Sequence, residues 1–177
     1  TSPEGGYSYS IFNTNSVKNI VFQDNITIIN DYAFAGVKLK TIEIPNSVIE
    51  INAYAFSDNY LKSVEIPNSV TTIGFSAFWG CTSFTSVTIG SGVTTIGDFA
   101  FYDCTGLTRV DISDIGAWCN ISFGNYYSNP LYYAENLYLN GVLVTDLVIP
   151  YSVKSIGKYA FSGCTGLESI TIPYSVN

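Results

Sequence analysis

The chain has 177 residues, of which 47% are hydrophobic and 12% are charged, and its formal net charge is −7. This length and apolar content indicate one folded domain, and the negative charge disfavours nucleic acid and anionic membranes as partners. Histidine is absent, which excludes Ser-His-Asp and Cys-His catalytic groups and histidine-ligated zinc. No run approaches the roughly 18 consecutive apolar residues of a membrane helix, so we predict no direct membrane insertion for this fragment.

Residues 1–16 are rich in Ser, Gly and Tyr, and we interpret them as an N-terminal flank or cap. From residue 17 onward one pattern recurs seven times: an aliphatic or aromatic residue, two others, an apolar residue, one other and a second apolar residue. The copies start 22 or 23 residues apart, except for one gap of 37 residues. They are Val17-Ile20-Phe22, Leu39-Ile42-Ile44, Leu61-Val64-Ile66, Phe84-Val87-Ile89, Leu107-Val110-Ile112, Val144-Leu147-Ile149 and Leu167-Ile170-Ile172.

Each unit also carries a second set of recurring residues between its apolar copies. A Pro-X-Ser-Val turn follows four of the copies, and an Ile-Gly pair and an Ala-Phe pair come next in most units. The period of two in each copy predicts a short strand with one buried face, and proline ends the strand because it cannot donate to the ladder. One unit cannot cover its own apolar face, so stacked units must share a core. We therefore predict a single solenoid over residues 17–177, with short parallel strands on one face and turns or short 3₁₀ segments on the other.

The unit LxxIxIPxSVxxIGxxAFxxCxxL resembles the BspA-like leucine-rich repeat family over nearly all of residues 17–176. Some units depart from it: Gln23, Gly90 and Ser113 replace the proline, and Val37 and Asn59 replace the cysteine. The resemblance implies a curved solenoid in an extracellular or cell-surface protein that acts in adhesion or host-protein binding. It implies no catalytic residues, and we expect no enzyme activity, no cofactor and no metal site.

The gap of 37 residues indicates one irregular repeat, with an insertion at about residues 113–143. Ile115, Trp118, Ile121 and Phe123 supply inward residues, and residues 137–144 predict a β-hairpin because Asn-Gly favours a two-residue turn. The segment before the hairpin is rich in tyrosine. Two interpretations remain open: the insertion covers the core, or it forms a partner-binding surface. The candidate binding residues of the insertion are Tyr126, Tyr127, Tyr132 and Tyr133.

The outward positions of the predicted strands form an open polar face. Glu43 and Glu65 should lie about 5 Å apart on neighbouring strands, a separation that also suits the carboxylate pair of a retaining glycosidase. A solvated polar face explains the residues more simply than catalysis or a cation site, because nothing in the sequence encloses this pair. The candidate partner-binding residues of the open face are Thr41, Glu43, Ser63, Glu65, Ser86, Thr88, Arg109 and Asp111.

Three of the four cysteines, Cys81, Cys104 and Cys164, share one phase of the repeat and predict a buried ladder in the place that Asn takes in other leucine-rich repeats. Neighbouring coils put Cys81 and Cys104 within reach of a disulfide, although free thiols are the preferred interpretation. Cys119 has no base or cation nearby in the sequence, so we expect it to be unreactive. No CxxC spacing points to zinc.

Two functional hypotheses follow. The first is a non-catalytic module that binds a host protein or glycan at the cell surface. The second is a structural spacer that assembles end-to-end through its repeats, since the last unit stops after Val176-Asn177. A solenoid with an uncapped apolar end favours association, so we expect either a longer natural protein or self-association.

Overall fold

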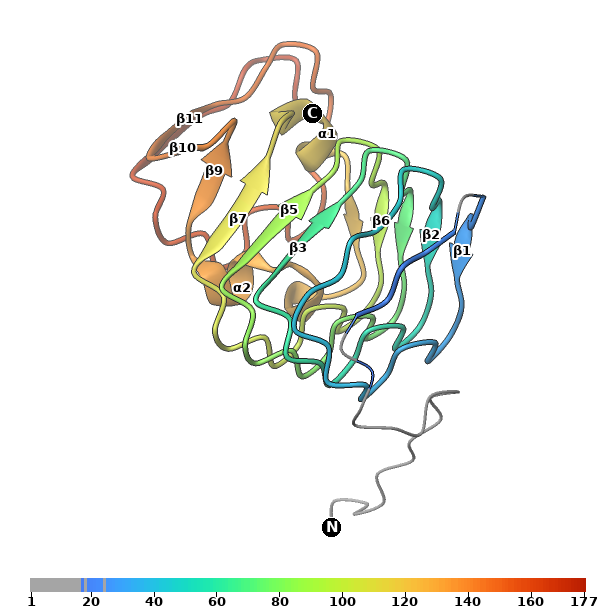
Figure 1. Ribbon diagram of the computed structural model, residues 1–177. Coiled ribbons are helices and arrows are strands. Elements are labelled where there is room, and N and C mark those ends of the chain that lie inside the picture. The colour runs from blue at the N-terminus through green and yellow to red at the C-terminus, as the bar shows by residue number, and fades with distance from the viewer. Residues whose placement is uncertain (1–16, 18, 24) are drawn as a thin grey trace.

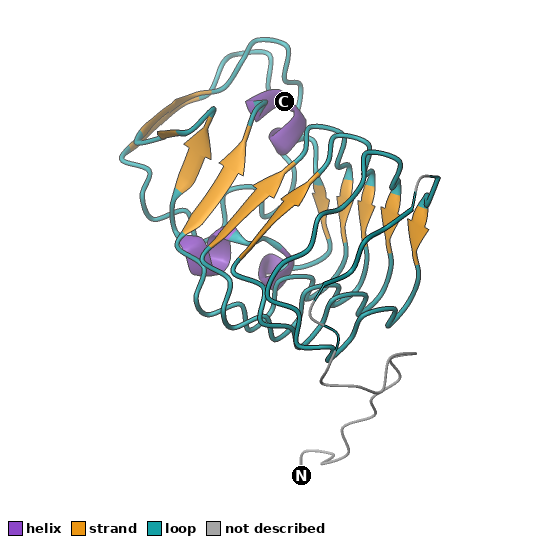
Figure 2. Cartoon of the chain, in the orientation of Figure 1, coloured by secondary structure: helices purple, strands orange, loops and turns teal. Residues whose placement is uncertain are grey.

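The computed structural model describes residues 17, 19–23 and 25–177, and the predicted flank at 1–16 lies outside these residues. The chain winds as a β-solenoid in which each repeat forms one coil (Figure 1). Two walls of short strands face each other across the core, and turns join them (Figure 2). In the described part of the chain, no helix is long and apolar enough to cross a membrane.

The first wall contains the strands that the repeated copies predict. β3 (Ser63–Ile66), β5 (Ser86–Ile89) and β7 (Arg109–Ile112) pair in parallel and in register. Their second and fourth residues are buried and the others face outward, as the period of two requires. The predicted parallel sheet of stacked units is therefore confirmed for these three coils.

The second wall is a sheet of five two-residue parallel strands, one from each coil. The sequence predicts inward apolar residues here but not a sheet. Only the last residue of each strand is buried, while N–H and C=O groups continue the ladder from coil to coil. The strands are β1 (Ile28–Ile29), β2 (Glu50–Ile51), β4 (Thr72–Ile73), β6 (Thr95–Ile96) and β8 (Ser122–Phe123).

The prediction of strands at 17–22 and 39–44 is wrong: the described residues there, 17, 19–22 and 39–44, form no strand. In the second of them Leu39 and Ile44 are buried as expected. The Leu39 carbonyl accepts the Tyr60 N–H at 2.9 Å, but the next bond, from Lys62 N–H to the Lys40 carbonyl, is 3.4 Å long. The apolar pattern fixes which side chains point inward, but too few ladder bonds form to make a strand.

The irregular repeat differs from the prediction in its path. β9 (Leu137–Leu139), from within the expected insertion, pairs in parallel with β7 and continues the first sheet. Residues 113–136 form a longer coil that includes α1 (Ile115–Cys119), the 3₁₀ turn η1 (Tyr126–Ser128) and α2 (Leu131–Ala134). All four predicted inward residues of this coil are buried.

The predicted hairpin is confirmed and interrupts the sheet. β10 (Val142–Leu143) is antiparallel to β9, and the turn residues Asn140 and Gly141 have φ values of 51° and 81°. Because β10 occupies the edge beside β9, the copy at 144–149 does not join this sheet. Instead its strand, β11 (Asp146–Val148), pairs with β12 (Ser169–Thr171) in a separate two-stranded parallel sheet.

The core contains a ladder of phenylalanines from the Ala-Phe pairs. Phe34, Phe56, Phe78 and Phe101 stack with successive ring centroids 5.5, 5.4 and 5.3 Å apart. The inward assignment of the Ala-Phe pairs is confirmed, since Phe56, Phe78 and Phe101 are all 0% exposed. Four successive coils thus contribute one ring each to a continuous apolar column.

A second ladder satisfies the carbonyl groups between coils. The Asn59 side-chain amide donates to the Phe34 carbonyl of the previous coil, and the Cys81 and Cys104 thiols donate in the same way to Phe56 and Phe78. All four thiols are free. Burial raises the pKa of Cys81 to about 12 and that of Cys119 to about 11, so both thiols stay protonated and unreactive at neutral pH.

Candidate binding surfaces

The open face of the first sheet presents two rows of side chains across the coils. Ser63, Ser86 and Arg109 are in register in one row. The second row has Glu65, Thr88 and Asp111, and the hairpin strand β9 adds Tyr138. Thr41 and Glu43 are exposed on the neighbouring extended segment. The eight predicted open-face residues therefore lie on one continuous surface, which the repeat phase alone determines.

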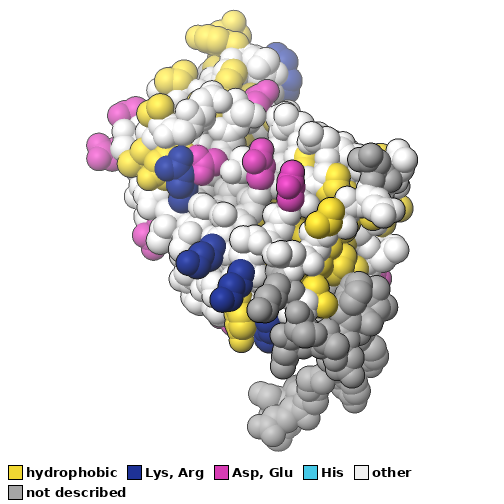
Figure 3. All heavy atoms as spheres, viewed as in Figure 1, with side chains coloured by type: hydrophobic (Ala, Val, Ile, Leu, Met, Phe, Trp, Pro, Cys, Tyr) yellow, Lys and Arg dark blue, Asp and Glu magenta, His cyan; other side chains and the backbone are white. Residues whose placement is uncertain are grey.

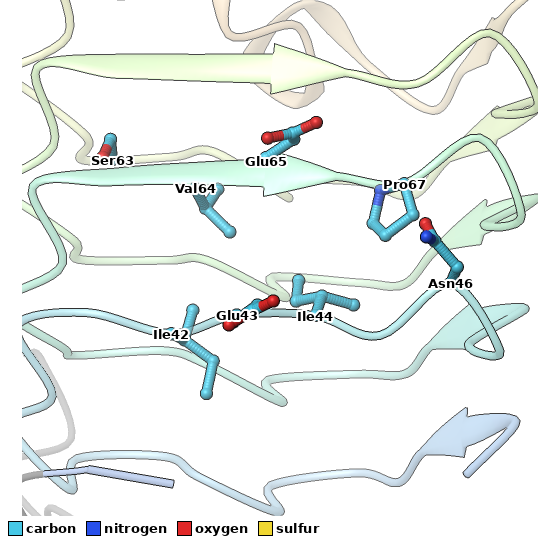
Figure 4. Close-up of a pocket in the computed structure, with 8 residues that line it drawn as sticks. All are labelled: Ile42, Glu43, Ile44, Asn46, Ser63, Val64, Glu65 and Pro67. Atoms are coloured by element: carbon cyan, nitrogen blue, oxygen red, sulfur yellow. The ribbon is translucent and has the colours of Figure 1, made fainter. Parts of the chain in front are cut away.

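A groove crosses this surface at the ends of the strands. It consists of two adjoining hollows, of about 340 and 560 Å³, which share Asn46, Glu65 and Pro67. The first hollow also contains Glu43, and Figure 4 shows Glu43 and Glu65 on neighbouring coils along it. The second extends past Asp111 to the hairpin turn at Asn140 and Gly141. We call these two hollows the sheet groove.

The charges of the sheet groove are unbalanced. The Arg109 guanidinium binds both oxygens of Asp111, with each N to O distance 2.6 Å, and it lies 3.8 Å from the ring centroid of Tyr138. The Asp111 carboxylate raises the pKa of Arg109 by this hydrogen bond. No ion pair joins Glu43 or Glu65 to a cation within the residues that the structure describes. Figure 3 shows most of the acidic side chains of this face on its upper part, where basic side chains also lie, and further basic side chains lower down.

Few potential metal ligands surround the two carboxylates in the described part of the chain. Among residues 17, 19–23 and 25–177, no group of three or more Asp, Glu or Cys side chains is placed to hold a metal ion. Glu43 and Glu65 are exposed and accept no hydrogen bond from the described residues. What this arrangement can do is attract and orient a cationic group that approaches along the groove.

The tyrosines of the irregular coil form a second surface. Tyr126, Tyr127 and Tyr132 contact one another, with ring centroids 4.0, 4.9 and 5.6 Å apart, and we call them the tyrosine cluster. Tyr126 and Tyr132 are 40% and 38% exposed. Hydrogen bonding to the Tyr126 side chain is the largest cause that raises the pKa of Tyr127.

The fourth predicted tyrosine of the insertion is not part of this cluster surface. Tyr133 is half-buried, and its hydroxyl accepts the Asp103 N–H at 3.0 Å, which joins α2 to the previous coil. Burial raises the pKa of Tyr133. Its position therefore suits the covering interpretation of the insertion, whereas the other three tyrosines suit the binding interpretation.

Buried polar side chains hold the tyrosine cluster in place. The Asn129 amide donates to the carbonyls of Tyr159 and Ala160 in the following coil, at 2.8 and 3.0 Å, and its oxygen accepts the Leu131 N–H at 2.9 Å. Ser128 and Asn125 close a capping box around η1. The tyrosines are therefore presented on a backbone that is fixed from both sides.

Aromatic residues of other coils extend this surface, and sequence analysis did not identify them. Phe99 and Tyr102 contact Tyr127 with ring centroids 5.9 and 4.8 Å apart, and Tyr159 contacts Tyr126. Phe99 and Tyr159 directly precede an Ala-Phe pair, and both have a left-handed φ that turns the chain there, 59° and 68°. The shared phase before Ala-Phe was the signal that could have revealed them.

Comparisons with known proteins agree with this architecture. A family model described as the BspA type leucine rich repeat region matches residues 7–128 and 134–177 in six copies. A leucine-rich repeat protein from Bacteroides ovatus is 31% identical, with a TM-score of 0.58, over 86% of this chain and 42% of its own. A leucine rich cell surface protein from Faecalibacterium prausnitzii is 31% identical, with a TM-score of 0.44, over 72% of this chain and 30% of its own. A leucine-rich repeat protein from T. pallidum is 28% identical, with a TM-score of 0.49, over 75% of this chain and 58% of its own.

A comparison with curated proteins gives no match. The chain spans only 42% and 30% of the length of the first two solved structures. The family model nevertheless covers most of the chain, and the structure stacks the matched repeats as successive coils. The chain therefore belongs to the BspA-type leucine-rich repeat family.

Proposed function

We propose that the chain is a non-catalytic interaction module of a cell-surface or secreted protein, and that its sheet groove binds a protein segment bearing lysine or arginine. The observation that carries the proposal is that two carboxylates without an ion-pair partner, Glu43 and Glu65, line one groove, and that the Glu65 strand is held by its ladder with β5. A cationic segment gains Coulomb attraction there without displacing an internal ion pair.

Arg109 supports this choice of partner. It is the arginine of the open face. Its ion pair with Asp111 and its cation–π contact with Tyr138 are both made inside the chain. Asp111 is thereby neutralised, but the other two carboxylates of the groove keep their charge. The formal net charge of −7 also favours a basic partner over an anionic glycan.

Surface localisation and the absence of catalysis rest on the family. The Faecalibacterium prausnitzii structure is described as a cell surface protein. We assign the same location to this chain. We also assign it no enzyme activity, in keeping with its repeat family, and Glu43 and Glu65 lie exposed on an open face.

The test is a binding screen of the purified chain against extracellular matrix proteins, host surface proteins and a glycan array. The double variant Glu43→Gln/Glu65→Gln removes the groove charge, and Glu50→Gln/Glu168→Gln removes the same charge elsewhere as a control. Binding to basic proteins should be lost in the groove variant only, and should weaken with salt. Hits confined to glycans, or hits that both variants retain, would overturn the proposal.

A second candidate function is a spacer that assembles end-to-end. The last strand, β12, exposes Ile170, and Ile172 and Tyr174 follow it with 53% and 89% of their surface exposed. An exposed apolar edge strand is a template for pairing with another chain. Sedimentation equilibrium over a range of concentrations tests this: association that Ile170→Lys/Ile172→Lys abolishes supports the spacer, and a monomer at all concentrations contradicts it.

A further inference from the structure

The tyrosine cluster presents aromatic rings that hold no cation among the described residues, whereas three other tyrosines each do. Lys38 lies 4.9 Å from the ring centroid of Tyr60, Arg109 lies 3.8 Å from that of Tyr138, and Lys158 lies 4.8 Å from that of Tyr159. Among the described residues, no lysine or arginine is placed over Tyr126, Tyr127 or Tyr132. Tyr126 and Tyr132, which are 40% and 38% exposed, are therefore available to a cation from outside.

The surroundings of the cluster are acidic. Asp103 bonds to Tyr133 through its N–H, Asp98 lies beside Gly124 at the start of the tyrosine segment, and Glu135 caps α2. No ion pair joins these carboxylates to a cation in the part of the chain that is described. Lys158 lies over the ring of Tyr159, and Tyr159 in turn contacts Tyr126 of the cluster. Asp98, Asp103 and Glu135 outnumber Lys158 in the segments next to the cluster, and the formal net charge of the chain is −7, so a basic partner suits this surface.

We propose that the tyrosine cluster is a second binding site, which takes arginine side chains of a protein partner on the outer faces of its rings. A planar guanidinium stacks on aromatic rings and is weakly hydrated, so arginine suits this site better than lysine does. The segment Gly124–Tyr133 consists mostly of Tyr, Asn, Ser and Gly, the residues that supply rigid contact area and adaptable hydrogen bonds in antibody binding loops.

The ring spacings exclude an aromatic cage that encloses a cation between the three rings. In an aromatic cage a cation lies over the faces of several rings, within about 6 Å of each centroid, so even rings at right angles need centroids roughly 6 Å apart. The three centroids of the cluster lie only 4.0 to 5.6 Å from one another. The cluster is therefore a platform for stacking, and it has no space for a quaternary ammonium group between its rings.

This site is separate from the sheet groove. The groove lies where the strands of the first sheet end, whereas α2 packs near the beginning of β7, at the opposite end of the strands (Figure 1). No residue of the tyrosine cluster lines either hollow of the groove. The chain can therefore contact one large partner at two places or two partners at once.

The experiment isolates the cluster by neutralising the groove. A short peptide of alternating arginine and glycine is titrated into Glu43→Gln/Glu65→Gln protein by calorimetry, alongside the lysine-glycine analogue. Adding Tyr126→Ala/Tyr132→Ala should weaken arginine-peptide binding about 10-fold, as the loss of two stacking rings implies. The lysine peptide should bind more weakly than the arginine peptide before the tyrosines are removed, and the two should bind alike afterwards.

Two further variants control the result. Tyr151→Ala/Tyr174→Ala removes an equally aromatic pair that is 67% and 89% exposed outside the cluster, and it should leave binding unchanged. If the double cluster variant does not fold, Tyr132→Ala alone should still give a measurable loss, and Tyr126→Phe/Tyr132→Phe should retain binding. Unchanged affinity in the cluster variants, equal loss in the control, or no binding to the groove-neutralised protein would overturn the second site while leaving the groove proposal in place.

Discussion

The rings of Phe56 and Phe78 lie parallel, with an interplanar angle of 11° and centroids 5.4 Å apart, and both are fully buried. Because Phe78 also stacks on Phe101, it is an interior member of the column. Phe78→Ala should therefore lower the free energy of unfolding by about 3–5 kcal/mol, through lost burial and the cavity that remains. Urea unfolding of the two proteins measures this, and a loss below about 1 kcal/mol would contradict the stacked core.

The buried thiol of Cys81 should make stability depend on alkaline pH. Its pKa is raised from 9.0 to about 12 in the folded chain, so the folded state keeps a proton that the unfolded state releases. The contribution is complete below pH 9 and falls as the pH rises towards 12. At pH 10 the loss for this thiol is about 1 kcal/mol. Cys81→Ala should lose less stability than the wild type between pH 8 and pH 10, since tyrosines and lysines titrate alike in both. Parallel pH curves would contradict this.

Gly92 lies against the backbone of the preceding coil at Asn68. A Cβ atom there would lie 1.9 Å from the Asn68 carbonyl oxygen, and the corresponding position of other coils is Ser47, Ser69 or Ser175. Gly92→Ala should therefore destabilise the fold by about 2–3 kcal/mol, because backbone must move. The matched control is Gly116→Ala in α1, where the nearest atom is the Asp114 side-chain oxygen at 3.2 Å, and the change should be within about 1 kcal/mol. Equal melting temperatures for both variants would show that the coils do not touch at Gly92.

Removing Arg109 should strengthen cation binding in the groove. Arg109→Gln releases Asp111 and leaves a third unpaired carboxylate on the open face. The pair is partly exposed, so the change in unfolding free energy should be small. Affinity for a lysine-glycine peptide, measured by calorimetry at low salt, should rise about 3-fold or more. Weaker binding would mean that Arg109 itself contacts the partner.

Much of this fold follows from the repeat phase of the sequence. The positions of Val64, Val87 and Val110 predict three strands and their register, and the Asn140-Gly141 pair predicts the hairpin. These features depend on local chemistry: a period of two, a strand-ending proline and a turn that needs positive φ. They can be identified before any long-range contact is known.

The features that sequence analysis missed depend on contacts between coils. The strands of the second sheet have only two residues each, too few to show a period of two in the sequence. In the first sheet β9 pairs with β7 in the place expected for the copy at 144–149, because the hairpin occupies the sheet edge. The repeat phase correctly predicts that the outward residues of β3, β5 and β7 lie in register on one sheet. The pairing of Arg109 with Asp111, and of Phe99 and Tyr159 with the tyrosine cluster, depends on side-chain placement that one sequence does not specify.

The most direct measurement of the proposed function is a calorimetric titration of the chain with a lysine-glycine peptide, with and without Glu43→Gln/Glu65→Gln. Saturable binding that weakens with salt and falls about 10-fold or more in the groove variant is the predicted result, with Glu50→Gln/Glu168→Gln unchanged. Equal binding by the groove variant and the control would show that net charge alone attracts the peptide, and it would contradict a specific role for the groove.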